Sequence, residues 1–277
     1  MLSNGQEFLD TLFVSSLLTL TQMFSYLSIF LIIGFAIAKM EEKRNRWIRA
    51  SVGVKGIYTT ALIGVPIHEL GHAIMCLVFG HHVDKIKFVQ FGDPHGTMGY
   101  VNHSYDPKNL FHRIGMFFIG VAPIMMGIFS ITVAYRLLLP ESFELWWEKI
   151  TKSDTATESL LATFSVVPSL FTGDNLSSLS LYLFLGFSIA VASHMTLSPP
   201  DIKGARSGLF FIFIIGTLIN MFYVPHMYDV NVSDLFINDY NLFIYSVSLI
   251  ALLFSGVATG IAFILYKIRN VVKGTPQ

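Results

Sequence analysis

The sequence predicts an all-α membrane protein with about six transmembrane helices and a small β-hairpin between the second and the third. Three observations support this fold class. Hydrophobic residues fill 53% of the 277 positions and charged residues only 13%, about half the charged fraction of ordinary soluble domains. Several apolar runs reach the ~20 residues that a helix needs to cross a bilayer. One polar segment instead has the pattern of two short strands around a turn.

Six apolar runs are the predicted membrane spans. They cover residues 12–38, 52–79, 110–139, 179–197, 209–224 and 242–266. A shorter run, residues 160–171, contains Pro168, and we expect it to be re-entrant or interfacial rather than spanning. We predict one polytopic domain over residues 1–277. Its core is about 52–206, and its peripheral helices are 12–38, 209–228 and 242–266.

The polar links between these runs differ in character. Residues 39–49 read as a short basic loop, and residues 140–158 as a polar link whose Trp146 and Trp147 suit a membrane interface. Residues 82–108 hold two β-prone stretches, IKFVQF and TMGYVNHSY, around the turn-like GDPHG. Two such stretches around a Gly/Pro/Asp cluster predict a β-hairpin.

The orientation in the membrane follows from the number of spans. Six spans place the 39–49 and 140–158 links on one face. The hairpin, the 199–206 loop and the C-terminal tail then lie on the other. The 18 Lys and Arg residues divide equally between these faces, so the positive-inside rule does not choose an orientation. We expect a multi-pass protein of a prokaryotic cell membrane.

The run GVPIHELGHAIM carries the strongest chemical signal. It places His68, Glu69 and His72 within the second span. Residues four apart on a helix share a face about 6 Å apart, so both imidazoles can bind one Zn²⁺ while Glu69 acts as general base and then general acid. Ionisable groups inside a membrane helix are costly and usually functional. The alternative is a polar helix end satisfied by water and neighbouring helices.

A catalytic zinc site usually has three protein ligands and an open position. Asp201, in HMTLSPPDIKG, is the best candidate for the third ligand because two prolines end the preceding helix there. The alternative role for Asp201 is a helix N-cap. His194 is the second candidate ligand, and it could instead hydrogen-bond the oxyanion or simply be packed. Asp174, in TGDN, is a weaker candidate that fits a turn.

The remaining Cys and His residues carry weaker signals. Cys76 is the only cysteine, and in its apolar surroundings we expect a buried, inert thiol rather than a nucleophile. His81 and His82 follow the second span, where cationic groups suit the helix dipole. His95 and His103 fall in the hairpin, and we expect them to line the substrate path or to bind nothing.

The motifs together resemble the site-2 protease family of intramembrane zinc metalloproteases. HELGHA, the hairpin KFVQFGDPHGTMGYV, the helix RIGMFFIGVAPIMMG and the segment SHMTLSPPDIKG carry the resemblance over about residues 55–205. The family's Asn has no equivalent, since Ser193 or His194 stands near its position. Pro200 replaces the Leu before Asp201, and the following glycine is Gly204. The resemblance implies that Asp201 and both chain termini are cytoplasmic.

We therefore predict a zinc metalloendopeptidase that hydrolyses membrane-embedded or membrane-associated protein substrates. Its partners would be a protein or peptide substrate and the lipid bilayer. A net charge of zero gives no reason to expect nucleic acid. An extended substrate could pair with the hairpin edge around Phe88 and Tyr100. The alternatives are a polytopic transporter and a non-catalytic membrane protein that uses the helix to bind a metal.

Overall fold

Five long apolar helices dominate the computed structural model, which describes residues 3–93, 96–153, 155–223 and 239–273. The chain is therefore a predominantly helical membrane protein, as predicted. Residues 224–228, the end of the predicted peripheral helix 209–228, lie outside the described ranges. The five helices are α1 (Ser3–Ser51), α2 (Val54–Val78), α3 (Leu110–Leu138), α9 (Pro199–Tyr223) and α11 (Asp239–Lys273).

The predicted fourth span is shorter than expected. Helix α8 covers only Leu179–Ala192, and at 1.5 Å per residue its 14 residues extend about 21 Å, less than the ~30 Å hydrocarbon core. The chain then leaves the helix and starts α9 at Pro199, because prolines favour a helix start and disfavour α-geometry just before it. Six spans are therefore not confirmed for the described part of the chain.

The predicted basic loop 39–49 is wrong, because these residues continue helix α1 to Ser51. The run KMEEKRNR contains strong helix formers. Glu42 also pairs with Lys39 at 3.5 Å and with Arg46 at 3.2 Å along the helix. The helical path breaks only at Gly53, whose φ of +82° few other residues tolerate.

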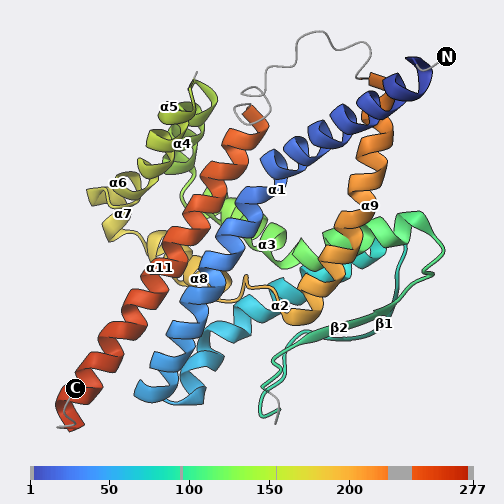
Figure 1. The fold of residues 1–277 in the computed structure, drawn as a ribbon. Coiled ribbons are helices and arrows are strands. Elements are labelled where there is room, and N and C mark those ends of the chain that lie inside the picture. The colour runs from blue at the N-terminus through green and yellow to red at the C-terminus, as the bar shows by residue number, and fades with distance from the viewer. Residues whose placement is uncertain (1–2, 94–95, 154, 224–238, 274–277) are drawn as a thin grey trace.

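Helices α1 and α11 lie side by side and run in the same direction (Figure 1). Near the start of α11, the Asn241 amide donates to Ser25 Oγ at 3.0 Å. Near its end, the Arg269 guanidinium donates to the backbone carbonyl of Ser51, the last residue of α1. The described chain ends therefore lie at opposite ends of the bundle, whereas six full spans would place them at the same end. The short α8 accounts for the difference, because the prediction treated residues 179–197 as a full span.

The link between α8 and α9 packs against the second half of α1. The Thr196 hydroxyl donates to the Glu41 carboxylate, and the buried Arg44 donates to the Ser193 carbonyl. The prediction that residues 39–49 and the 199–206 loop lie on opposite faces is therefore wrong. Both errors have one origin, since the prediction counted α8 as a full crossing.

The predicted hairpin is confirmed. Strand β1 (His82–Lys87) pairs antiparallel with β2 (Tyr100–Ser104), from His82 opposite Ser104 to Lys87 opposite Tyr100. Beyond the strands, Gln90 N–H donates to the Met98 carbonyl at 2.7 Å. The hairpin lies along one side of the helices, close to α2 and to the start of α9 (Figure 1).

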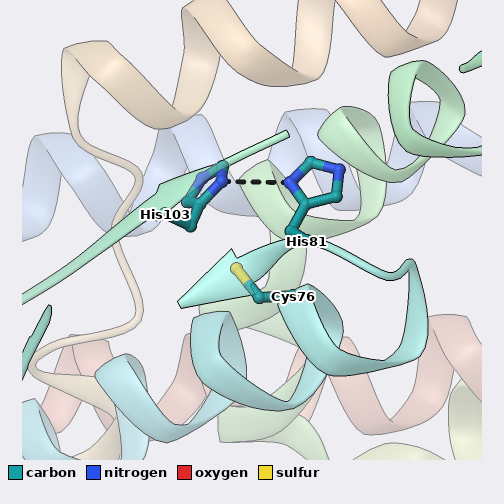
Figure 2. Close-up of side chains that lie close together, drawn as sticks. All are labelled: Cys76, His81 and His103. Atoms are coloured by element: carbon teal, nitrogen blue, oxygen red, sulfur yellow. Dashed lines mark hydrogen bonds between the residues drawn. The ribbon is translucent and has the colours of Figure 1, made fainter. Parts of the chain in front are cut away.

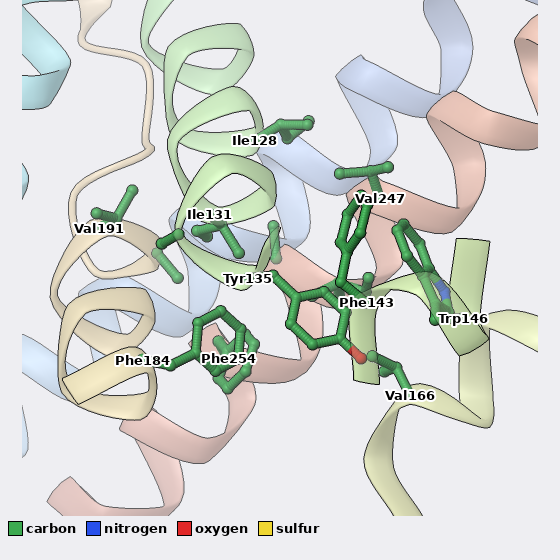
Figure 3. Packing of buried hydrophobic residues seen from close by; sticks show 14 of the residues in the cluster. Ile128, Ile131, Tyr135, Phe143, Trp146, Val166, Phe184, Val191, Val247 and Phe254 are labelled. Atoms are coloured by element: carbon green, nitrogen blue, oxygen red, sulfur yellow. The ribbon is translucent and has the colours of Figure 1, made fainter. Parts of the chain in front are cut away.

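Residues 140–177 form four short helices rather than a polar link. Trp146, expected at the membrane interface, is only 1% exposed and packs in the apolar core beside Tyr135 and Phe143 (Figure 3). The reason is that Phe143, Trp146 and Ile150 share one buried face of an amphipathic helix. The run 160–171 becomes the end of α5 and α6. The four helices are α4 (Pro140–Thr151), α5 (Ala156–Phe164), α6 (Val166–Leu170) and α7 (Gly173–Ser177).

Candidate metal centre

The three predicted metal ligands converge at one place. His68 and His72 lie on α2, and Asp201 lies in the first turn of α9. One ligand atom from each residue falls within 4.8 Å of the others. His72 Nε2 lies 3.2 Å from His68 Nε2 and 3.4 Å from Asp201 Oδ1. The fold therefore assembles from two distant segments the ligand set that the sequence predicts.

Backbone carbonyls fix the protonation of both imidazole rings. His68 Nδ1 donates to the carbonyl of His194 at 2.7 Å, and His72 Nδ1 donates to the carbonyl of Ile119 at 2.8 Å. A carbonyl oxygen can only accept, so each Nδ1 carries the ring proton. In the neutral rings, each Nε2 then presents a lone pair, and the two lone pairs face each other.

These distances and protonation states fit a zinc ion. Tetrahedral zinc with Zn–N bonds of about 2.0–2.1 Å separates two nitrogen ligands by about 3.3–3.4 Å. The measured 3.2 Å and 3.4 Å lie at that separation. Metal-binding histidines commonly donate their other ring N–H to a carbonyl, as His68 and His72 do. Facing lone pairs repel each other, and a shared cation removes that repulsion.

A capping interaction holds the Asp201 carboxylate in place. Ser198 precedes α9, and both its backbone N–H (2.7 Å) and its hydroxyl (2.6 Å) donate to Asp201 Oδ2. Asp201 N–H donates back to Ser198 Oγ at 3.4 Å, which completes the reciprocal arrangement of a capping box, and Oδ1 is left facing His72. The N-cap position of α9 is therefore held by Ser198 and not by Asp201, which lies in the first turn and keeps Oδ1 for the candidate metal position.

Close packing of α3 against α9 fixes the position of Asp201 relative to α3. A Cβ atom on Gly120 would lie 2.5 Å from the Asp201 carbonyl oxygen and 2.8 Å from Ala205 Cβ. Only glycine permits that approach without displacing one of the helices. Helix α3 thus contributes in two ways, because its Ile119 carbonyl also orients His72.

Glu69 borders a cavity of about 630 Å³ that contains the three ligands. It is only 6% exposed. The cavity is bounded by α2, the hairpin segment 97–103, α3, the link between α8 and α9, and Glu41. The hairpin approaches Glu69 directly, since a Cβ on Gly99 would lie 2.9 Å from Glu69 Oε1. The hairpin is therefore one wall of the candidate site.

Glu41 is a cavity residue that the sequence interpretation missed. It falls within the supposed 39–49 loop, yet it lines the site and accepts from Thr196. The signal available was the helix-forming composition of KMEEKRNR, which contains no Gly or Pro. Continuing α1 through it brings Glu41 to the cavity.

His194 and Asp174 lie in different surroundings. The buried His194 ring borders the cavity, with its Nε2 3.1 Å from Thr60 Oγ1. Its clearest contribution is its backbone carbonyl, which orients His68. An oxyanion-binding role for its ring stays a prediction. Asp174 lies in the first turn of α7 and is not part of the three-ligand cluster.

No family model, curated protein or solved structure matches this chain. The resemblance to the site-2 protease family therefore remains a prediction from motifs.

Proposed function

We propose that this protein is an intramembrane zinc metalloprotease of a prokaryotic cell membrane. The observation that carries the proposal is the pair of facing Nε2 atoms on His68 and His72, 3.2 Å apart, with Asp201 Oδ1 at 3.4 Å. Zinc bound there would polarise a carbonyl and lower the pKa of a bound water. Glu69, adjacent in sequence to His68 and buried beside the same cavity, provides the base.

Glu69 has the chemistry of the proton carrier in peptide hydrolysis. Its carboxylate would accept a proton from the attacking water and return it to the leaving amine. His194 borders the same cavity. If its ring turned from Thr60, a protonated Nε2 would donate to the developing oxyanion. Glu69 and His194 are therefore the two proposed catalytic residues, with His68, His72 and Asp201 as the metal ligands.

The hairpin is the proposed binding site for an extended substrate peptide. Residues 97–103 form one wall of the cavity, and Tyr100 is among them. Within the described part of the chain the sheet has two strands, so each strand keeps one edge for pairing with a peptide. Phe88, 42% exposed near the end of β1, offers an apolar contact. A helical substrate would have to unwind first, because helical backbone groups are already paired.

The test compares cleavage by the wild type and by Glu69→Gln in native membranes. Each form is expressed in a host cell, and new protein N-termini in the membrane fraction are quantified by mass spectrometry. We expect N-termini within or beside apolar segments in the wild-type sample and their loss with Glu69→Gln. Glu42→Gln is the matched control, because Glu42 lies on the exposed side of α1.

Two results would count against the proposal. One is an identical set of new N-termini for the wild type and for a membrane-inserted, zinc-loaded Glu69→Gln. The other is zinc flux into protein-containing vesicles that persists in Glu69→Gln, which would favour the transporter alternative.

A further inference from the structure

A second cluster of metal-ligating side chains lies at the end of α2. Cys76, His81 and His103 each offer a ligand atom, and these atoms lie within 4.8 Å of one another. Figure 2 shows the Cys76 sulfur and the two imidazoles converging from α2, from the start of the hairpin and from β2. Cys76 is 0% and His81 4% exposed. The sequence interpretation expected an inert thiol here and no ligand role for either histidine.

The hydrogen bonds of His81 orient it as a ligand. Its Nε2 donates to the carbonyl of His112 at 2.9 Å, so Nδ1 of the neutral ring carries a lone pair. That Nδ1 lies 3.0 Å from His103 Nδ1 (Figure 2). In the absence of a cation, His103 Nδ1–H donates to it. With a cation, His103 takes the other tautomer, and both Nδ1 atoms face the ion.

The spacing suits a tetrahedral ion with mixed ligands. Zinc bonds of about 2.3 Å to sulfur and 2.0–2.1 Å to nitrogen separate neighbouring ligands by about 3.3–3.6 Å. The cluster lies within 4.8 Å as it stands, so small side-chain rotations suffice.

We propose that Cys76, His81 and His103 form a second, structural metal site for a thiophilic divalent cation, Zn²⁺ being the natural occupant. Thiolate and imidazole together favour zinc over magnesium or calcium. The Cys76 thiol would release its proton to solvent on binding, and water would fill the fourth position. The site goes beyond the proposed protease function and does not depend on it.

The location explains what such an ion would do. Cys76 lies one helical turn beyond His72 on the same face of α2, about 6 Å away. His103 lies on β2, whose neighbouring residues wall the proteolytic cavity. An ion joining Cys76 to His103 would tie the hairpin to the helix that carries HELGH. It would thereby hold the substrate-binding wall at a fixed distance from Glu69.

The sole cysteine makes the test specific. Because the chain has one cysteine, a thiolate-to-Co²⁺ charge-transfer band in the cobalt-loaded protein can arise only at Cys76. We expect that band in the wild type and in His68→Ala/His72→Ala, and its loss in Cys76→Ala. Metal analysis of the purified full chain should show two zinc ions per wild-type chain. Cys76→Ala or His103→Ala should lose one of them.

The control is His82→Ala, since His82 adjoins His81 but its side chain is 82% exposed. It should keep both ions and the band. A cobalt-loaded wild type without the charge-transfer band overturns the proposal, as does full zinc content in Cys76→Ala and His103→Ala. A band in the wild type with only one ion per chain would support this site and count against the metal centre of the proposed protease. The wild-type and double-variant spectra decide even if Cys76→Ala does not fold.

Discussion

His68 and His72 present their Nε2 atoms to each other at 3.2 Å, while backbone carbonyls hold both of their Nδ1 protons. Between two neutral imidazoles this arrangement is unfavourable, because the lone pairs of the two Nε2 acceptors face and repel each other. The arrangement becomes favourable once a cation lies between them. The predictions below test the groups that create it.

Zinc content should distinguish the ligands from the other polar residues of the site. We expect His72→Ala and Asp201→Ala each to lose the zinc ion of this centre. His194→Ala should retain it, since the contact of His194 with His68 is made by its backbone carbonyl. Metal analysis of the purified chains checks this. Zinc retained in Asp201→Ala but lost in His194→Ala would instead make His194 the third ligand.

Ser198 should affect metal affinity without touching the metal. Ser198→Ala removes one of the two donors to Asp201 Oδ2, and loss of such outer contacts typically weakens metal binding about 10–100-fold. Loss of the cap should also lower the free energy of unfolding by about 1 kcal/mol. Chelator competition measures the affinity. Thr172→Ala, which removes the cap of the distant α7, should leave it unchanged.

Gly99 should control access to Glu69. A Cβ on Gly99 would lie 2.7 Å from Val65 Cγ1 and 2.9 Å from Glu69 Oε1, so Gly99→Ala must displace the hairpin or the carboxylate. We expect the cleavage rate to fall at least about tenfold, because small displacements of reacting groups slow a reaction strongly. The zinc ion should be retained. The control is Gly186→Ala, because a Cβ on Gly186 meets no atom within 4 Å. Equal cleavage by Gly99→Ala and wild type would show that the hairpin does not bound the active site.

Gly120 should govern the packing of α3 on α9. In Gly120→Ala, the added methyl group would lie 2.5 Å from the Asp201 carbonyl oxygen. Overpacking of this kind costs about 1–3 kcal/mol, and it should weaken zinc binding because Asp201 moves. Thermal unfolding in detergent and chelator competition measure the two effects. Gly256→Ala, on an open face of α11, should change neither, and unchanged affinity in Gly120→Ala would contradict the proposed coupling.

The chain ends should lie on opposite sides of the membrane. Single cysteines introduced separately at Gly5 and Val271 lie near the two described ends, and both positions are exposed, whereas the native Cys76 is fully buried. In sealed vesicles of uniform orientation, we expect a membrane-impermeant thiol reagent to label one and not the other. Labelling of both, or of neither until the membrane is permeabilised, would support an even number of crossings.

The membrane class, the hairpin and the shared helix face of His68 and His72 were all predictable from the sequence. Each of these depends on local pattern. An apolar run of sufficient length requires lipid, two β-prone stretches around GDPHG form the sheet, and a spacing of four residues places His68 and His72 on one helix face. Asp201 was also predicted from its local context after two prolines, although its partner Ser198 was not.

The features that depend on where one helix ends relative to another follow from tertiary packing and could not be predicted from local sequence. The early end of α8 at Ala192 altered the relation between the chain ends and the neighbours of Glu41. No local pattern predicts that Cys76 lies close to His103. The two side chains are brought together by the pairing of β1 with β2 and by the packing of the hairpin on α2. Hydropathy measures how apolar a segment is, whereas the depth at which a helix ends is set by its contacts with the rest of the bundle.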